Sequence, residues 1–248
     1  MNICLITVRS SSTRLKKKCF LRLGKYTVIE HILQRAIKFK LNPIICTTNQ
    51  PKDKIFKKIA NQNKVRIFFG SEKNKLKRWY DCTKKFKLKK FHTIDADDPY
   101  FDHKNVIKSL KLLIKNDIIK PSNNSREGSA SEGYSFRTKI LGKLLIKKNL
   151  MDDNKDTEMI DKIIEKNQLS LKISQLSNSK YITKKKFRLT LDYEEDYQLI
   201  NNLHSIFGSF ETRQKINFFL NKNSSLRHIN YFRNQQWKKR QKSIISMQ

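Results

Sequence analysis

The stretch that most constrains the fold lies near the start of the chain, where an apolar run over residues 3–8 leads directly into a cationic loop. An uninterrupted apolar run of this length is typical of a parallel strand buried on both faces. The loop carries hydroxyl side chains between Arg9 and Arg14, with a further cation at Lys18, and a helical pattern begins at Thr27. A strand, cationic loop and helix in this order favour a polyphosphate site, because backbone N–H and guanidinium groups bind phosphate oxygens. We therefore expect a nucleoside triphosphate, or a similar ligand, at this loop.

The rest of the chain alternates apolar strand candidates with helical patterns. This alternation predicts an α/β fold with a mostly parallel sheet and helices on both faces. Residues 120–135 interrupt the pattern and indicate a long loop. We expect strands at 43–47, 65–69, 91–94, 169–176 and 187–192. We expect helices from Thr27, over about 51–61, around 76–83, from His103 to Ile114, and at 138–149, 157–167, 194–207 and 211–221.

Length and composition indicate one well-buried domain with a modest appendage. We expect a single α/β domain over residues 1–221, followed by a basic extension over 222–248 that packs partly and frays from Lys238. The sequence shows no apolar stretch near the ~18–20 residues of a membrane span and no leader pattern before the first strand. The four cysteines are widely spaced, without a zinc or disulfide pattern. We expect a soluble cytoplasmic protein with no membrane partner.

The formal net charge of +32 has two interpretations. A strong positive charge can indicate nucleic acid or an anionic surface as partner. It can also reflect a general enrichment in lysine, accompanied here by abundant asparagine and isoleucine. The lysines are scattered along the chain and are not gathered with interleaved aromatic residues, which favours the second interpretation. We expect no specific nucleic-acid partner.

Acidic residues follow two of the predicted strands. Asp97 lies in an acidic turn after the strand at 91–94, and Asp192 ends the strand at 187–192. Open α/β sheets bind ligands at the carboxyl ends of their strands, so both side chains are expected at that edge. Magnesium takes one or two carboxylates and completes its shell with water and phosphate oxygens. Asp97 is a candidate ligand on this ground, whereas Asp192 taken alone fits a metal ligand and a helix cap equally well.

A series of motifs resembles the CMP-sugar synthetases, which are the acylneuraminate and Kdo cytidylyltransferases and their relatives in spore-coat and surface-polysaccharide synthesis. The similarity covers roughly residues 2–220 and rests on the order and spacing of the motifs. It implies a Rossmann-like nucleotidyltransferase fold, CTP as nucleotide, Mg²⁺ as cofactor, a sugar or sugar-acid acceptor, and a homodimer. The matching segments are Arg9-x-Ser-x-Ser-Thr-Arg14-Leu-x-x-Lys18, Thr27–His31, Thr47–Asn49, Gly70–Glu72, Leu76-x-Arg78-Trp79-Tyr80, Asp97–Asp102 and Arg188–Asp196.

The same resemblance implies roles for individual residues. Arg9, Arg14 and Lys18 would act on the CTP phosphates as the catalytic cations. Asp97 and Asp192 would hold Mg²⁺. The remaining nucleotide-binding candidates are Ser11 through its backbone N–H, Thr47, Thr48 and Asn49 beside base and ribose, and Arg78, while Glu132 and Glu158 are the acceptor-side candidates.

Departures from the family pattern leave alternatives open. Lys16 and Lys17 stand where a proline and a glycine are usual, and on the acceptor side Ala130 and Met159 replace a common aspartate and histidine. The favoured reaction is CTP + sugar → CMP-sugar + pyrophosphate, with a 2-keto sugar acid as acceptor. The alternatives are a nucleotidyltransferase of the same fold with another nucleotide or a sugar-phosphate acceptor, a homologue that binds nucleotide without turnover, and, from the charge alone, an RNA-binding protein.

Overall fold

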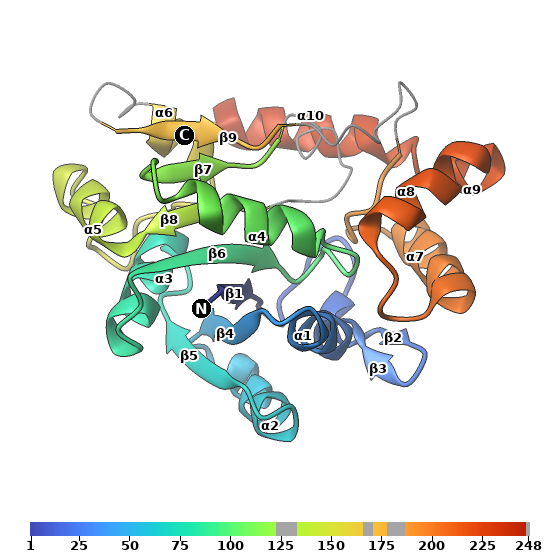
Figure 1. Cartoon of the computed structure of the whole chain (residues 1–248), viewed down its shortest axis with the longest axis horizontal. Coiled ribbons are helices and arrows are strands. Elements are labelled where there is room, and N and C mark those ends of the chain that lie inside the picture. The colour runs from blue at the N-terminus through green and yellow to red at the C-terminus, as the bar shows by residue number, and fades with distance from the viewer. Residues whose placement is uncertain (123–132, 166–170, 178–186, 247–248) are drawn as a thin grey trace.

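The computed structural model describes residues 1–122, 133–165, 171–177 and 187–246. Its main feature is a seven-stranded sheet with the order β5-β4-β1-β6-β8-β7-β9 (Figure 1). The pairs β5–β4, β4–β1, β1–β6 and β7–β9 are parallel, whereas β8 is antiparallel to both β6 and β7. The predicted α/β fold with a mostly parallel sheet is confirmed. The strands are β1 (Ile3–Thr7), β4 (Asn42–Thr48), β5 (Arg66–Gly70), β6 (Lys90–Asp95), β7 (Ile118–Lys120), β8 (Ser135–Arg137) and β9 (Ile173–Gln175).

Helices cover both faces of this sheet, and a short hairpin, β2 (Arg22–Leu23) with β3 (Tyr26–Thr27), precedes the first of them. Figure 1 shows α4 in front of the sheet and α7 to α9 beyond one end of it. The helices are α1 (Val28–Lys38), α2 (Ile55–Gln62), α3 (Lys75–Lys85), α4 (His103–Leu112), α5 (Thr138–Lys147), α6 (Ile160–Glu165), α7 (Glu194–Phe207), α8 (Arg213–Lys222), α9 (Ser224–His228) and α10 (Arg233–Ser246), with 3₁₀ turns η1 (Lys18–Phe20) and η2 (Pro51–Lys54).

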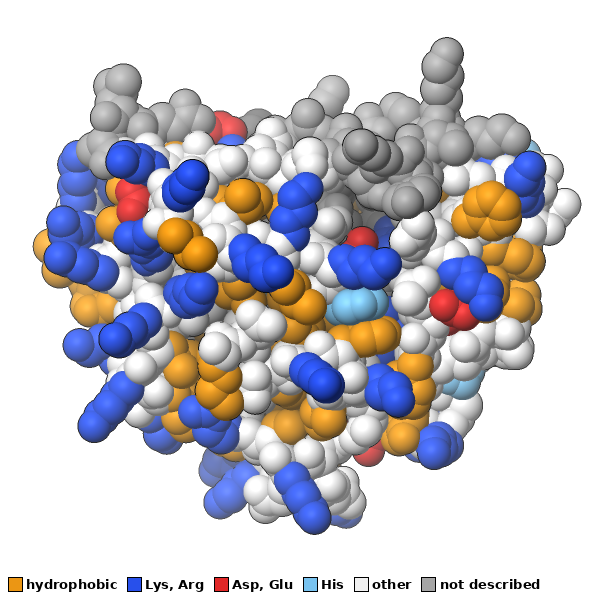
Figure 2. Space-filling view, in the orientation of Figure 1, with side chains coloured by type: hydrophobic (Ala, Val, Ile, Leu, Met, Phe, Trp, Pro, Cys, Tyr) orange, Lys and Arg blue, Asp and Glu red, His pale blue; other side chains and the backbone are white. Residues whose placement is uncertain are grey.

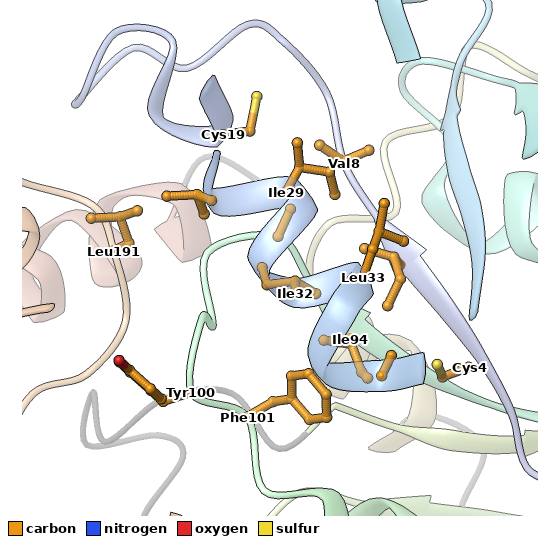
Figure 3. Close-up of a cluster of buried hydrophobic side chains, with 14 of the residues drawn as sticks. Cys4, Val8, Cys19, Ile29, Ile32, Leu33, Ile94, Tyr100, Phe101 and Leu191 are labelled. Carbon is orange, nitrogen blue, oxygen red and sulfur yellow. The ribbon is translucent and has the colours of Figure 1, made fainter. Parts of the chain in front are cut away.

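The buried side chains form two cores, one on each face of the sheet. Alternation along β1 directs Ile6 to the core that contains α1, α2, α4, α7 and α8, and Leu5 to the core that contains α3, α5 and α6. In the first core, Ile32 of α1 packs in the same cluster as Ile94 of β6 (Figure 3). In the second, Trp79 is fully buried between the sheet and its helices. Since both faces of the central strands are covered, their continuous apolar runs are explained.

Two sequence predictions for the second half of the chain differ from the structure. Residues 187–192 were expected to be a strand, but in the described part of the chain they pair with no strand. Their apolar side chains are nevertheless buried, and Leu191 N–H donates to the carbonyl of Asp97. The segment from Lys238, where fraying was expected, is assigned to α10 as far as Ser246. Lysine, arginine and glutamine are good helix formers, so a polar composition there did not exclude a helix.

Two expected elements lie partly outside the described residues. The strand expected at 169–176 appears as the shorter β9, and the helix expected at 157–167 appears as α6. The three-residue strand β7 was not predicted, and most of the loop expected over 120–135 lies outside the described residues. None of the described helices is long and apolar enough to cross a membrane. On the face drawn in Figure 2, lysine and arginine side chains are dispersed among side chains of other kinds.

Candidate active site

The loop after β1 is anchored at its start by Asp53, which is buried in η2. The backbone N–H and the hydroxyl of Ser10 both donate to Asp53 Oδ1, at 2.8 and 2.5 Å. The Thr48 hydroxyl at the end of β4 donates to Asp53 Oδ2. These bonds fix the loop against the neighbouring strand. Sequence reasoning missed Asp53, because its role depends on a contact between residues 43 positions apart.

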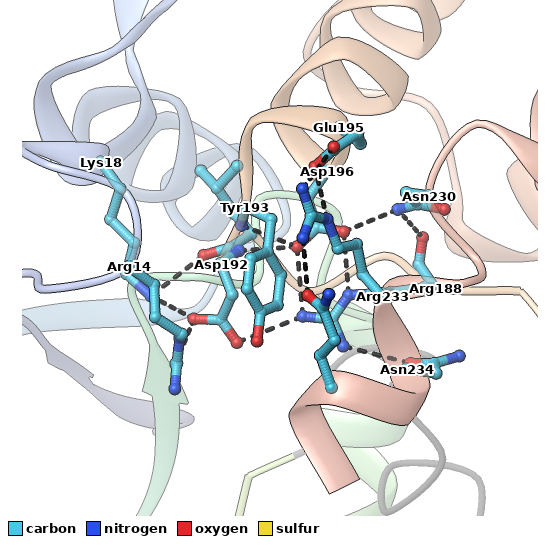
Figure 4. A network of polar contacts seen from close by, with 12 residues as sticks. Arg14, Lys18, Arg188, Asp192, Tyr193, Glu195, Asp196, Asn230, Arg233 and Asn234 are labelled. Carbon is cyan, nitrogen blue, oxygen red and sulfur yellow. Dashed lines mark hydrogen bonds and ion pairs between the residues drawn. The ribbon is translucent and has the colours of Figure 1, made fainter. Parts of the chain in front are cut away.

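The other end of the loop converges on two carboxylates. Lys18 Nζ lies 2.9 Å from Asp97 Oδ2 and 3.0 Å from Asp192 Oδ1, and it donates to the Leu191 carbonyl at 3.0 Å. Arg14 Nη2 donates to Asp192 Oδ1 as well, and Figure 4 shows both cations directed at this carboxylate. Arg14 and Lys18, which belong to one sequence motif, therefore meet Asp97 and Asp192, which belong to two others, in one cluster.

Asp192 is not used as a helix cap. The first turn of α7 is capped through Asp196, which accepts from the N–H groups of Asp192 and Tyr193 at 2.9 and 3.0 Å. The Asp192 carboxylate contacts Arg14, Lys18 and the buried Arg188 instead. The interpretation of Asp192 as a helix cap is therefore wrong, because Asp196 caps this turn, whereas its role as a metal ligand stays a prediction.

Charge compensation dominates the electrostatics of this cluster. Burial alone would raise the pKa of Asp192, but the Lys18 ammonium and the Arg14 guanidinium outweigh burial and lower the pKa to about 2. Burial would likewise lower the pKa of Lys18, but the Asp97 and Asp192 carboxylates raise it above its ordinary value. The Asp192 carboxylate and the Lys18 ammonium are therefore charged near neutral pH.

A second set of opposite charges lies beside the first. Arg9 Nη1 is 3.7 Å from Glu158 Oε1, and Lys75 Nζ is 3.0 Å from Asp95 Oδ1 and above the ring of Trp79. Lys75 lowers the pKa of Glu158, with a further contribution from Arg9. Glu158, an acceptor-side candidate, is thus adjacent to Arg9, a phosphate-side candidate. Lys75 was missed by sequence reasoning, because in a lysine-rich chain only its low exposure and its contacts with Asp95 and Trp79 distinguish it.

The other nucleotide candidates have mixed surroundings. Thr47 is fully buried, the Thr48 hydroxyl is bonded to Asp53, and Asn49 is exposed just beyond the end of β4. Arg78 is buried, and its Nη1 donates to the backbone carbonyls of Ser71 at 2.6 Å and Glu72 at 3.3 Å, so its guanidinium shapes the turn after β5. Ser11 is half-buried in the loop after β1, and Glu132 lies outside the described residues.

The contacts of Lys18 bear on whether the site suits a metal ion. Asp97 and Asp192 both contact the one Lys18 ammonium, so a single cation already lies between two carboxylates. Two carboxylates with open coordination for water and phosphate oxygens suit Mg²⁺. In the described ranges, no group of three His, Cys, Asp or Glu side chains is placed to hold a metal ion by itself. Asp97 and Asp192 are carboxylates of the kind that Mg²⁺ takes as ligands, and phosphate oxygens and water would complete its shell.

Comparison with known proteins agrees with the fold. The cytidylyltransferase family model matches residues 3–237, and the chain therefore belongs to that family. The resemblance inferred from the motifs is confirmed at this level. The chain is also 30% identical over 233 residues to an uncharacterized protein of Methanocaldococcus jannaschii, with 92% of this chain and 93% of that protein covered.

Solved structures resemble it over most of their length. A cytidylyltransferase from Leptospira borgpetersenii is 25% identical, with a TM-score of 0.79 over 92% of this chain and 97% of that one. A CMP:2-keto-3-deoxy-manno-octonic acid synthetase complexed with CTP is 10% identical, with a TM-score of 0.60 over 83% of this chain and 99% of that one. The second likeness concerns the fold alone.

Proposed function

We propose that this cytidylyltransferase transfers CMP from CTP to a hydroxyl group of a sugar, forming a CMP-sugar and releasing pyrophosphate. The acceptor that we propose is a 2-keto sugar acid used in surface polysaccharides. The observation that supports this proposal is the meeting of Arg14 and Lys18 with Asp97 and Asp192. Such a cluster can hold a triphosphate and its counter-ion at the carboxyl end of the sheet.

Arg14 and Lys18 would supply the positive charge for the leaving group. Both are paired with Asp192, and in a complex with CTP they would direct part of their hydrogen bonding to phosphate oxygens. As the sugar hydroxyl attacks the α-phosphorus, negative charge develops on pyrophosphate, and fixed cations stabilise it. Loss of one such contact is expected to lower the rate about 10²–10³-fold.

Asp97 and Asp192 would hold Mg²⁺. When bound there, Mg²⁺ neutralises phosphate charge and favours ionisation of the attacking hydroxyl. On the acceptor side, Glu158 lies next to Arg9 and is kept ionised by Lys75, which lowers its pKa. Glu158 would accept hydrogen bonds from sugar hydroxyl groups, and Arg9 would contribute to binding the phosphates. The loop anchor at Asp53 would keep these groups in place during the reaction.

The proposal is tested by pyrophosphate release. Purified protein is incubated with Mg²⁺ and each of the four ribonucleoside triphosphates, against a panel of 2-keto-3-deoxy and nonulosonic sugar acids and sugar phosphates. We expect release with CTP and a 2-keto sugar acid, and at least a 100-fold lower rate for Asp97→Asn. Asp81→Asn is the matched control, because Asp81 pairs with Lys77 on the surface of α3 and its loss should leave the rate unchanged.

Other results point to the alternatives. Release with a different nucleotide or with a sugar phosphate would make the protein a nucleotidyltransferase of another specificity. Binding of CTP by calorimetry without release across the panel would favour a homologue that binds nucleotide without turnover. Absence of both binding and release would contradict the proposed function.

A further inference from the structure

The segment after α8 carries two buried asparagines among basic and mostly exposed neighbours. Asn230 is fully buried at the turn before α10, and Asn234 is 4% exposed in the first turn of α10. Neither was singled out in the sequence, where this segment appeared as a basic extension. Buried amide side chains need hydrogen-bond partners, so their partners indicate what this segment does.

Both asparagines contact the residues that surround Asp192. Asn230 Nδ2 donates to Asp196 Oδ1 at 2.8 Å and to the Arg188 carbonyl at 3.0 Å. Asn234 Oδ1 accepts from Arg188 Nη1 at 3.1 Å. Figure 4 shows the two amides on the side of Arg188 that faces away from Lys18.

Arg188 in turn connects this segment to the site. Its side chain is fully buried, and it donates to Asp196 Oδ1 and Oδ2 at 2.8 and 3.1 Å and to Asp192 Oδ2 at 3.3 Å. A path of two hydrogen bonds thus leads from Asn234 through Arg188 to Asp192. A planar guanidinium with its donors directed at fixed acceptors has one favoured orientation. Asn234 and Asp196 together therefore set the direction in which Arg188 meets Asp192.

Contacts of Arg233 also connect the segment after α8 to the residues around Asp192. Arg233, the first residue of α10, donates to both carboxylate oxygens of Glu195 at 2.8 and 2.6 Å and lies over the ring of Tyr193. The Arg188 guanidinium lies over the rings of Tyr193 and Trp237, 5.4 and 6.0 Å from their centroids. The start of α10 is thereby joined to the start of α7, directly after Asp192.

The two oxygens of Asp192 have different partners. Oδ1 contacts Arg14 and Lys18 of the loop after β1, and Oδ2 contacts Arg188. In the proposed function, Arg14 and Lys18 engage phosphate, and Arg188 then remains as the cation that orients Asp192. A carboxylate that is held by one oxygen presents the other in a fixed direction. If the Arg188 side chain were not held in one orientation, Asp192 Oδ1 would no longer be presented in a fixed direction.

We propose that Asn230 and Asn234 are positioning residues for the metal ligand Asp192, acting through Asp196 and Arg188. This inference rests on the proposed function, because it takes Asp192 as a ligand of the divalent ion. The segment after α8 is then part of the active-site support. Hydrogen-bond partners behind a metal ligand typically change metal affinity or activity 10–100-fold when they are removed.

The test uses the full chain and Mn²⁺ as probe, with binding measured by electron paramagnetic resonance in the presence of CTP. Asn234→Leu removes the acceptor for Arg188 at nearly constant size, and we expect Mn²⁺ binding to weaken about tenfold. Asn234→Asp keeps the acceptor, and it removes an Nδ2 group that is buried without a partner among the described residues. It should bind Mn²⁺ within about threefold of the unmodified chain. Gln235→Leu, on the exposed neighbouring position, is the matched control.

A double-mutant cycle that combines Asn234→Leu with Asp192→Asn distinguishes an effect of Asn234 on the position of Asp192 from a general loss of stability. If Asn234 acts through Asp192, Asn234→Leu should have no further effect on Mn²⁺ binding once Asp192 is replaced. Folding of each variant is checked by thermal unfolding, and Asn234→Ser replaces Asn234→Leu if the latter is unfolded at the assay temperature. Equal Mn²⁺ affinity in the unmodified chain and in a folded Asn234→Leu or Asn234→Ser variant would overturn the inference, even if CMP transfer is established. Failure of the unmodified chain to bind Mn²⁺ with CTP would overturn the metal role of Asp192, and the inference with it.

Discussion

At the scale of single residues, Lys17 has a backbone conformation that favours glycine. Its φ is 53°, in the left-handed region, directly before Lys18 in the loop that is proposed to bind phosphate. A side chain with a Cβ atom costs about 1–2 kcal/mol in this region. In the family that the sequence resembles, a glycine is usual at this position, so the lysine keeps the turn at a cost in stability.

Lys17→Gly is therefore expected to raise the free energy of unfolding by about 0.5–1 kcal/mol, because relief of the left-handed strain exceeds the greater flexibility of glycine in the unfolded chain. Urea unfolding of the purified variants measures the change. Lys16→Gly is the control, since Lys16 has no positive φ and should lose stability. Equal midpoints for the two variants would show that Lys17 is not strained.

The site illustrates which residues a sequence can reveal. Arg14, Lys18 and Asp97, which the structure brings together with Asp192, could be predicted because a strand end places its following residues at one edge of a parallel sheet. Asp192 was predicted through the family resemblance of Arg188–Asp196, although the strand expected before it does not form. Lys75, Asp53, Asn230 and Asn234 were missed, because each resembles many surface residues of the same type until burial and long-range contacts distinguish it. Local patterns specify where a strand ends, whereas the partners of a buried polar group are set by tertiary packing.

At the scale of elements, α1 begins with a reciprocal cap. The N–H of Glu30 donates to Thr27 Oγ1 at 3.4 Å, and the N–H of Thr27 donates to Glu30 Oε2 at 2.8 Å. This capping box satisfies two N–H groups that would otherwise lack helical partners. The helix predicted to begin at Thr27 is confirmed, and its apolar positions other than Ile37 are buried in the first core.

Thr27→Ala is expected to lower the free energy of unfolding by about 1 kcal/mol, because the cap hydroxyl is lost. Thr27→Ser keeps the hydroxyl and should cost only a few tenths of a kcal/mol. Chemical denaturation followed by circular dichroism measures both changes. If serine is as destabilising as alanine, the threonine methyl group and not the cap accounts for the effect.

Long strands with apolar runs could be predicted from the sequence, whereas the shortest strands could not. The strands β1, β4, β5 and β6 have apolar runs that sequence patterns detect readily. The three-residue strands β7 and β8 are too short to show a periodicity, and β8 is also antiparallel within an otherwise mostly parallel arrangement. Residues 187–192 have the apolar pattern of a strand because their apolar side chains are buried. This segment pairs with no strand among the described residues, and its packing places Asp192 beside Arg14 and Lys18.

At the scale of the whole molecule, the ion pairs of the site link stability to pH. The folded pKa of Asp192 is about 2, below the ordinary value of 3.8. A carboxyl group with a lowered folded pKa stabilises the folded state above its unfolded pKa, and this contribution is lost as the pH falls through the folded value. The relevant window therefore runs from about pH 4 down to about pH 2.

Asp192→Asn should be less stable than the unmodified chain at pH 7, and the titration of Asp192 contributes about 2 kcal/mol to this difference. The difference should shrink by about that amount between pH 4 and pH 2, because the carboxyl group becomes protonated in the unmodified chain. Urea unfolding of both proteins at several pH values measures it. A difference that stays constant down to pH 2 would contradict the lowered pKa of Asp192.

The ion pairs of the site also have a consequence for the release of product in the proposed reaction. Arg14 and Lys18 would bind pyrophosphate, and each also forms an ion pair with a carboxylate of the chain itself. Arg9 and Lys75 are balanced in the same way by Glu158 and Asp95. Departure of a product therefore restores ion pairs and leaves no cation without a counter-charge. The carboxylates of the chain thus compete with pyrophosphate for the same cations, and this competition favours product release. The carboxylates that hold the cations in place before the reaction would therefore also limit product inhibition after it.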